Sequence, residues 1–131
     1  MLYLLVYRNE AVDWDDRGHR IGFQGVELLA DFRPQWHHIF PQKFLEKKVP
    51  EHKINALANI AVIGPEINIR IRAQNPMDYI DRYKITAEKL SQQFINSDIR
   101  NVTVEAFDDW LNRRANILAE AANKYIAELR S

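Results

Sequence analysis

The strongest structural signal in the sequence is the helical spacing of apolar residues in its last quarter. Thr103 is a suitable N-cap, and acidic residues follow it where the positive end of a helix dipole favours negative charge. The pattern predicts a helix over about residues 103–130, with Arg113 and Arg114 on its more polar side. The apolar positions recur at steps of three, four and seven: Phe107, Leu111, Leu118, Ala121, Tyr125 and Leu129.

A short strand followed directly by a helix is predicted in the middle of the chain. Residues 60–63 form an apolar run that ends at Gly64-Pro65, which is typical of a strand and its terminus. Pro65 suits the first position of a helix, which we expect to extend to about Arg72. The apolar run at residues 2–7 is compatible with a strand or with a buried helix, and periodicity does not decide between them.

Weaker local signals mark three further segments. The run Asp15-Asp16-Arg17-Gly18 predicts a turn, and residues 47–53 read as a polar loop that contains a proline. Pro76 opens another short turn. Ala87, Leu90 and Phe94 have helical spacing.

Composition favours one soluble globular domain over residues 1–131. The chain has 131 residues, of which 47% are hydrophobic and 27% charged, and this is enough to bury a core. It has no cysteine, which excludes disulfides and thiolate zinc sites and fits a cytoplasmic location. No apolar run is long enough to span a bilayer, so no membrane partner is expected. The formal net charge is zero, whereas nucleic-acid-binding domains are often basic.

Two adjacent histidines and two asparagines form the candidate site. Asn59 lies twenty-one residues after His38, and Asn68 lies nine residues after Asn59 within the helix predicted to start at Pro65. Neighbouring residues of an extended segment point to opposite faces, so His37 and His38 can serve different purposes. Hydrolysis of a phosphodiester needs an activated water and a cation that neutralises phosphate charge. One of the two histidines could therefore bind a metal ion together with the Asn68 amide oxygen, while the other activates the water as a general base.

Basic residues near these positions are candidates for binding DNA phosphates. Arg72 is four residues after Asn68 and shares its helix face, and Arg70 lies between them. Lys43 begins a lysine-rich stretch that extends to Lys53. Each of these residue types is more often structural or solvated when it occurs alone, including a His-His pair, so the prediction depends on their conjunction.

The same residues resemble the HNH motif of the His-Me finger nucleases. His37-His38-Ile39-Phe40-Pro41 is similar to the first strand of that motif, Asn59 with the following apolar residues to its second strand, and Asn68 to the last ligand. The stretches WHHIFPQKFLE, INALANIAVIGPEINIRI, NPMDYI and FDDWLNRRANILAEA are similar to the C-terminal domain of GmrSD-type restriction proteins, in whose closing helix a residue such as Arg114 recurs.

This resemblance implies a fold and an activity. The fold would be α+β and mostly helical: a ββα-metal finger over about residues 34–73, embedded in helices, with a long C-terminal helix. The activity would be metal-dependent cleavage of DNA, in restriction or phage defence. His37 and Asn68 would be the metal ligands and His38 the general base. Asn59 would tie the loop and orient the catalytic histidine by a hydrogen bond. Relatives usually carry a ParB-like, nucleotide-using domain, so we expect this chain to be part of a longer protein or to work with such a partner.

The donor set of the candidate site also predicts which metal it would take. One imidazole and one amide oxygen favour Mg²⁺ or Mn²⁺, and they make a structural zinc site improbable. Two alternatives stay open. The first is a module that keeps the finger and binds nucleic acid without cutting it, and the second is a structural zinc or helix-packing domain.

Overall fold

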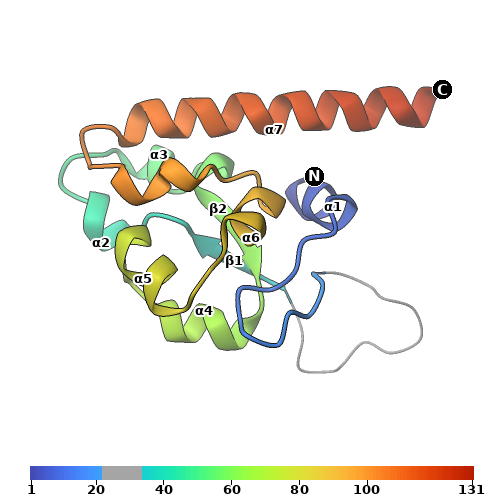
Figure 1. Ribbon diagram of the computed structural model, residues 1–131. Coiled ribbons are helices and arrows are strands. Elements are labelled where there is room, and N and C mark those ends of the chain that lie inside the picture. The colour runs from blue at the N-terminus through green and yellow to red at the C-terminus, as the bar shows by residue number, and fades with distance from the viewer. Residues whose placement is uncertain (22–33) are drawn as a thin grey trace.

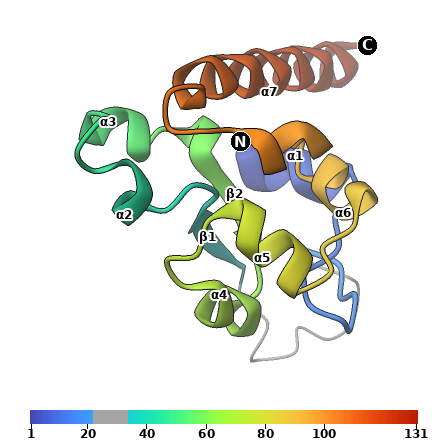
Figure 2. The same cartoon turned by 60° about the vertical axis from the view of Figure 1, so that its left-hand side comes forward.

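The fold is α+β, with many short helices, one small sheet and a long C-terminal helix, as the sequence predicts. The computed structural model describes residues 1–21 and 34–131. Figures 1 and 2 show α7 along one side of the molecule and α4 on the opposite side, with the two strands between them. The elements in chain order are α1 (Leu2–Arg8), β1 (Gln35–His38), α2 (Gln42–Leu45), α3 (Glu51–Ile54), η1 (Leu57–Asn59), β2 (Ile60–Ile63), α4 (Pro65–Ile71), α5 (Pro76–Arg82), α6 (Ala87–Gln92), η2 (Ser97–Asn101) and α7 (Phe107–Arg130).

Within residues 1–21 and 34–131 the sheet consists of β1 and β2, paired antiparallel with His37 opposite Ala61 and His38 opposite Ile60. Every residue of β2 is buried. No third strand of the described residues pairs with its edge away from β1, and side chains from other elements bond to that edge. The Gln93 amide accepts from Val62 N at 3.2 Å and donates to Val62 O at 2.6 Å, as a neighbouring strand would.

The α4 helix starts and packs as its sequence predicts. Pro65 occupies its first position, where a missing N–H has no consequence. The Gly64 N–H just before it donates to the buried carboxylate of Asp13 at 2.8 Å. Ile67 and Ile71 are buried, and α4 packs against β1. The helix ends at Ile71, one residue before the predicted Arg72, which has a left-handed φ of 49°.

The α7 helix begins later than predicted. Thr103 does not cap it: its Oγ1 accepts from Ala106 N within a preceding turn, and the helix spans Phe107–Arg130. The first half buries Phe107, Leu111 and Leu118. In the second half Ala121 and Tyr125 are only partly buried against the core, and Leu129 is 67% exposed.

The prediction that Arg114 lies on the polar side of this helix is wrong. Arg114 is 2% exposed, and its guanidinium donates to Ala58 O and Ile60 O, both at 2.8 Å, and to Gln93 O at 2.9 Å. Arg113 is on the polar side as predicted, and it pairs with Asp98 and Asp109. Arg114 therefore joins α7 to the unpaired edge of β2.

The weaker local predictions meet mixed outcomes. Residues 2–7 belong to a helix, and the turn ending at Gly18 is confirmed, with φ of 67° at the glycine and two backbone N–H groups bonded to Asp15 Oδ1. The predicted loop at residues 47–53 contains the start of α3. The turn after Pro76 is the helix α5. Phe94 lies beyond the end of α6.

Candidate functional site

His37 is a buried imidazole with one nitrogen at the edge of a cleft. The residue is 3% exposed, and its ring lies edge-on to those of Trp14 and Tyr79, with centroids 5.7 and 5.5 Å away. Its Nδ1 lies 3.0 Å from Asn68 Oδ1, and the residue also lines the cleft. Burial lowers the pKa of His37 to about 4, so the ring is neutral at pH 7. A neutral imidazole is the form that can bind a cation.

Gln35 fixes the amide orientation of Asn68. Asn68 Nδ2 donates to Gln35 Oε1 at 3.0 Å, so Asn68 Oδ1 faces His37. Because an amide oxygen only accepts, His37 Nδ1 carries the proton in this hydrogen bond. The prediction did not include Gln35. The available signal was its position two residues before His37 on a strand, which places both side chains on one face.

The pair of His37 Nδ1 and Asn68 Oδ1 has the spacing of two metal ligands. Adjacent ligands of an octahedral Mg²⁺ each lie about 2.1 Å from the ion, which puts them about 3 Å apart. A cation here would displace the Nδ1 proton to Nε2, which is buried and has no hydrogen-bond partner within residues 1–21 and 34–131. No group of three or more His, Cys, Asp or Glu side chains could hold a metal within these ranges. The residues therefore fit a weakly held hard cation that keeps water or phosphate ligands.

His38 is half-buried, and Asn55 determines which of its nitrogens is free. His38 Nε2 lies 2.9 Å from Asn55 Oδ1. The amide oxygen is an acceptor, so Nε2 carries the proton and Nδ1 keeps its lone pair. That is the state that a general base requires. Asn55 ends α3, and no sequence signal connected it to a histidine seventeen residues earlier.

Asn59 supports the backbone around the site and does not bond to the His38 ring within the described ranges. The expectation that Asn59 orients the catalytic histidine stays a prediction. Its fully buried amide accepts from Phe40 N at 2.9 Å and donates to Phe40 O at 3.0 Å and to Ile54 O at 2.9 Å. Asn59 thus joins the segment after His38 to the end of α3, which carries Asn55. The prediction was that Asn59 holds one loop, and in the structure it bonds to two segments, at Phe40 and at Ile54.

A cleft of about 690 Å³ collects most of the predicted phosphate-binding residues. Lys43 and Arg72 line it, whereas Arg70 does not and forms an ion pair with Glu66 at 2.8 Å. Arg70 thus lies outside the cleft lining, and its phosphate-binding role stays a prediction. The prediction missed Trp36, whose side chain lines the cleft while 59% exposed. The described residues that line the cleft are Trp36, His37, His38, Pro41, Gln42, Lys43, Glu46, Asn68, Arg72 and Ala73.

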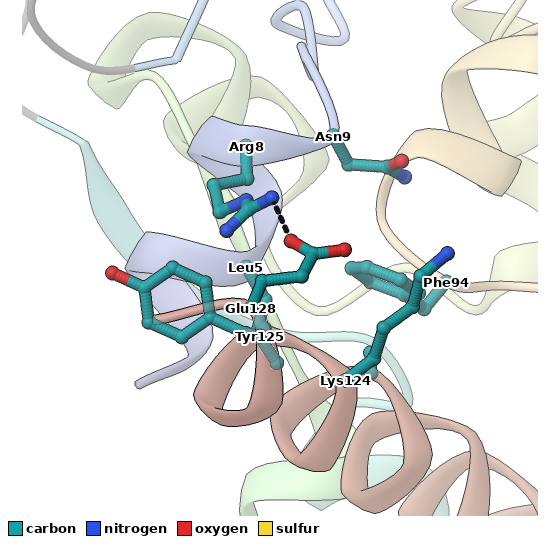
Figure 3. A pocket seen from close by; sticks show the side chains of 8 residues that line it. Leu5, Arg8, Asn9, Phe94, Lys124, Tyr125 and Glu128 are labelled. Carbon is teal, nitrogen blue, oxygen red and sulfur yellow. Dashed lines mark hydrogen bonds and ion pairs between the residues drawn. The ribbon is translucent and has the colours of Figure 1, made fainter. Parts of the chain in front are cut away.

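A second pocket of about 220 Å³ lies between α1 and α7, and two of its charged lining residues, Arg8 and Glu128, form an ion pair. Figure 3 shows Arg8 directed toward Glu128 with the Tyr125 ring beside it. The guanidinium lies 4.7 Å from the centroid of that ring. These contacts connect α1 to the C-terminal half of α7, and they indicate a structural role for Arg8.

Comparison of the chain with protein-family models, with curated proteins and with solved structures gives no match. None of the helices in the described ranges combines the length and the apolar composition that crossing a membrane requires. The functional interpretation therefore depends on the geometry of the cleft and on the sequence resemblance.

Proposed function

We propose that this protein is a metal-dependent DNA endonuclease of the HNH type. The observation that carries the proposal is the meeting of three predicted residues in one cleft: His37 Nδ1 lies 3.0 Å from Asn68 Oδ1, and His38 lines the same space. In this proposal β1, β2 and α4 are the ββα-metal finger. A role in restriction or phage defence, a cytoplasmic location and a ParB-like partner domain belong to the same proposal.

Each residue of the cleft would have a separate role in the reaction. His37 and Asn68 would hold Mg²⁺ or Mn²⁺, which supplies charge stabilisation at the phosphate when bound. His38 Nδ1 would take a proton from a water molecule as the water oxygen forms a bond to phosphorus. The bond from phosphorus to the leaving oxygen breaks, and that oxygen takes a proton from solvent. Lys43 and Arg72 would bind flanking phosphates.

Nicking of supercoiled plasmid in Mg²⁺ or Mn²⁺ tests the proposal. Removal of a general base typically lowers a rate 10²–10⁴-fold, so we expect a loss of about this size for His38→Ala. His52→Ala is the matched control, because His52 is an exposed histidine of α3 outside the cleft lining. Asn68→Ala should raise the metal concentration needed for half-maximal nicking.

Two results would contradict the assignment. Equal nicking by the His38→Ala and His52→Ala variants would exclude His38 as the base. An unchanged metal requirement in both the His37→Ala and Asn68→Ala variants would exclude the ligand pair. Binding of DNA without nicking in either cation would favour the non-cleaving module, and tight zinc binding coupled to folding would favour the structural zinc domain.

A further inference from the structure

Trp36 is an exposed aromatic side chain to which the proposed reaction assigns no purpose. The chain has three tryptophans, and the other two, Trp14 and Trp110, are buried. Trp36 stands directly before His37 on β1 and is 59% exposed while it lines the cleft. Tryptophan is enriched at binding interfaces, where its large aromatic face supplies contact area.

The cations beside this indole are also available to a ligand. Lys43 and Arg72 line the cleft with Trp36, and neither forms an ion pair within the described residues. Three other basic residues nearby in sequence are already matched: Lys48 pairs with Glu105, Lys53 with Asp108 and Arg70 with Glu66. Glu46 is the one carboxylate in the lining. An aromatic face beside two free cations fits a ligand that has both phosphates and planar bases.

We propose that Trp36 stacks on an unpaired base, so that the nucleic acid bound in this cleft is single-stranded or locally unpaired. In a duplex the faces of each base are covered by its neighbours, whereas an unpaired or terminal base offers a free face. Stacking also adds affinity beyond the counterion release that the lining cations Lys43 and Arg72 can provide. The inference names the substrate class of the proposed nuclease site. The inference rests on the proposed nuclease function only in assuming that the scissile phosphate lies in this cleft.

Binding without cleavage tests the inference separately from the nuclease activity. The His38→Ala variant in EDTA is titrated with a twelve-nucleotide single strand that has no self-complementarity and with the same strand paired to its complement, and tryptophan fluorescence and anisotropy of labelled DNA are followed. We expect the single strand to bind more tightly and to quench the fluorescence of Trp36, the exposed tryptophan. Trp36→Leu, made in the same variant, should weaken single-strand binding about tenfold, and Trp36→Phe should keep it within about threefold. Met77→Ala, an exposed apolar substitution outside the cleft lining, should change nothing.

The outcomes separate the two proposals. Equal affinity for the duplex and the single strand, or equal affinity of the Trp36→Leu and Met77→Ala variants, would overturn the stacking inference even if the protein nicks plasmid. No binding of either DNA would also overturn it, and would leave a protein segment as the occupant of the cleft. Single-strand binding lost on Trp36→Leu supports it even if His38→Ala has no effect on nicking, in which case the nuclease assignment alone fails.

Discussion

Replacement of the buried Arg114 tests how the small sheet is held in place. In Arg114→Met the apolar stem is kept and the donors are lost, so the carbonyl groups of Ala58, Ile60 and Gln93 lose their partner. Hydrogen bonds from a charged donor contribute about 1.5–3 kcal/mol each. Burial of the guanidinium is itself unfavourable, and it lowers the pKa of Arg114 to about 9. This shift corresponds to a cost of about 5 kcal/mol for keeping the charge, and the uncharged methionine avoids part of that cost. The hydrogen bonds outweigh this recovery, and we expect a net loss of about 2–4 kcal/mol of unfolding free energy.

Urea denaturation followed by circular dichroism measures this loss, with Arg113→Met as the control. Arg113 is the next residue of α7, and its ion pairs with Asp98 and Asp109 are exposed, so its replacement should change stability by less than about 1 kcal/mol. Arg114→Lys keeps the charge but not the fork of donors, and it should lose nearly as much as Arg114→Met. An Arg114→Met variant as stable as the wild type would refute the reasoning, since it would mean that the carbonyl hydrogen bonds do not offset burial of the guanidinium.

Two further predictions concern the residues of the site itself. Burial lowers the pKa of His37 to about 4, so as the pH falls the unfolded chain protonates this imidazole before the folded protein does. The free energy of unfolding should therefore fall by up to about 3 kcal/mol between about pH 6.5 and pH 4. Chemical denaturation across this range should show the slope in wild type and in His52→Gln, and a His37→Gln variant that kept the full slope would refute the assignment. Asn59→Ala leaves Phe40 N, Phe40 O and Ile54 O without their partner, so we expect a loss of about 3 kcal/mol in urea denaturation. Asn116→Ala, at an exposed position of α7, is its control and should lose less than about 0.5 kcal/mol.

Local patterns in the sequence predicted the elements that depend on local physics. The strand at residues 60–63 and the start of α4 at Pro65 follow from an apolar run and from the one helix position where a proline is favourable. The long helix follows from its apolar spacing. The beginning of this helix was predicted too early. Thr103 accepts a hydrogen bond from a backbone N–H as an N-cap does, but the turn that it caps ends before α7 begins.

The burial of Arg114 contradicts residue type but not residue spacing. Arg114 is three residues after Leu111 and four before Leu118, so it lies on the buried face that these two residues define. Its charge suggested the opposite. The deciding fact is that unpaired carbonyl groups of η1 and β2 face that position, and this is not visible in the sequence of α7.

The side chains that orient the candidate site were predictable to different degrees. Gln35 shares a strand face with His37, so alternation alone could have suggested its contact with Asn68. Asn55 reaches His38 only because the chain turns back between them, and Asn59 holds that return by bonds to both segments. The residue types of a site can be read locally, whereas the partners that set its tautomers depend on how the loops close.

A two-stranded sheet is too small to hold a site rigidly without help, since sheets of this size are marginal by themselves. In this protein the help comes from side chains of distant segments: Gln93 and Arg114 bond to the open edge of β2, and Asn59 bonds to the backbone that follows β1. Each of these groups is buried, so each stabilises the fold and positions the cleft at once. The distance between His37 and Asn68 therefore depends on residues that never reach the cleft. Variants of Gln93 or Arg114 should couple any loss of stability to a loss of site geometry, which variants of the exposed Lys43 should not.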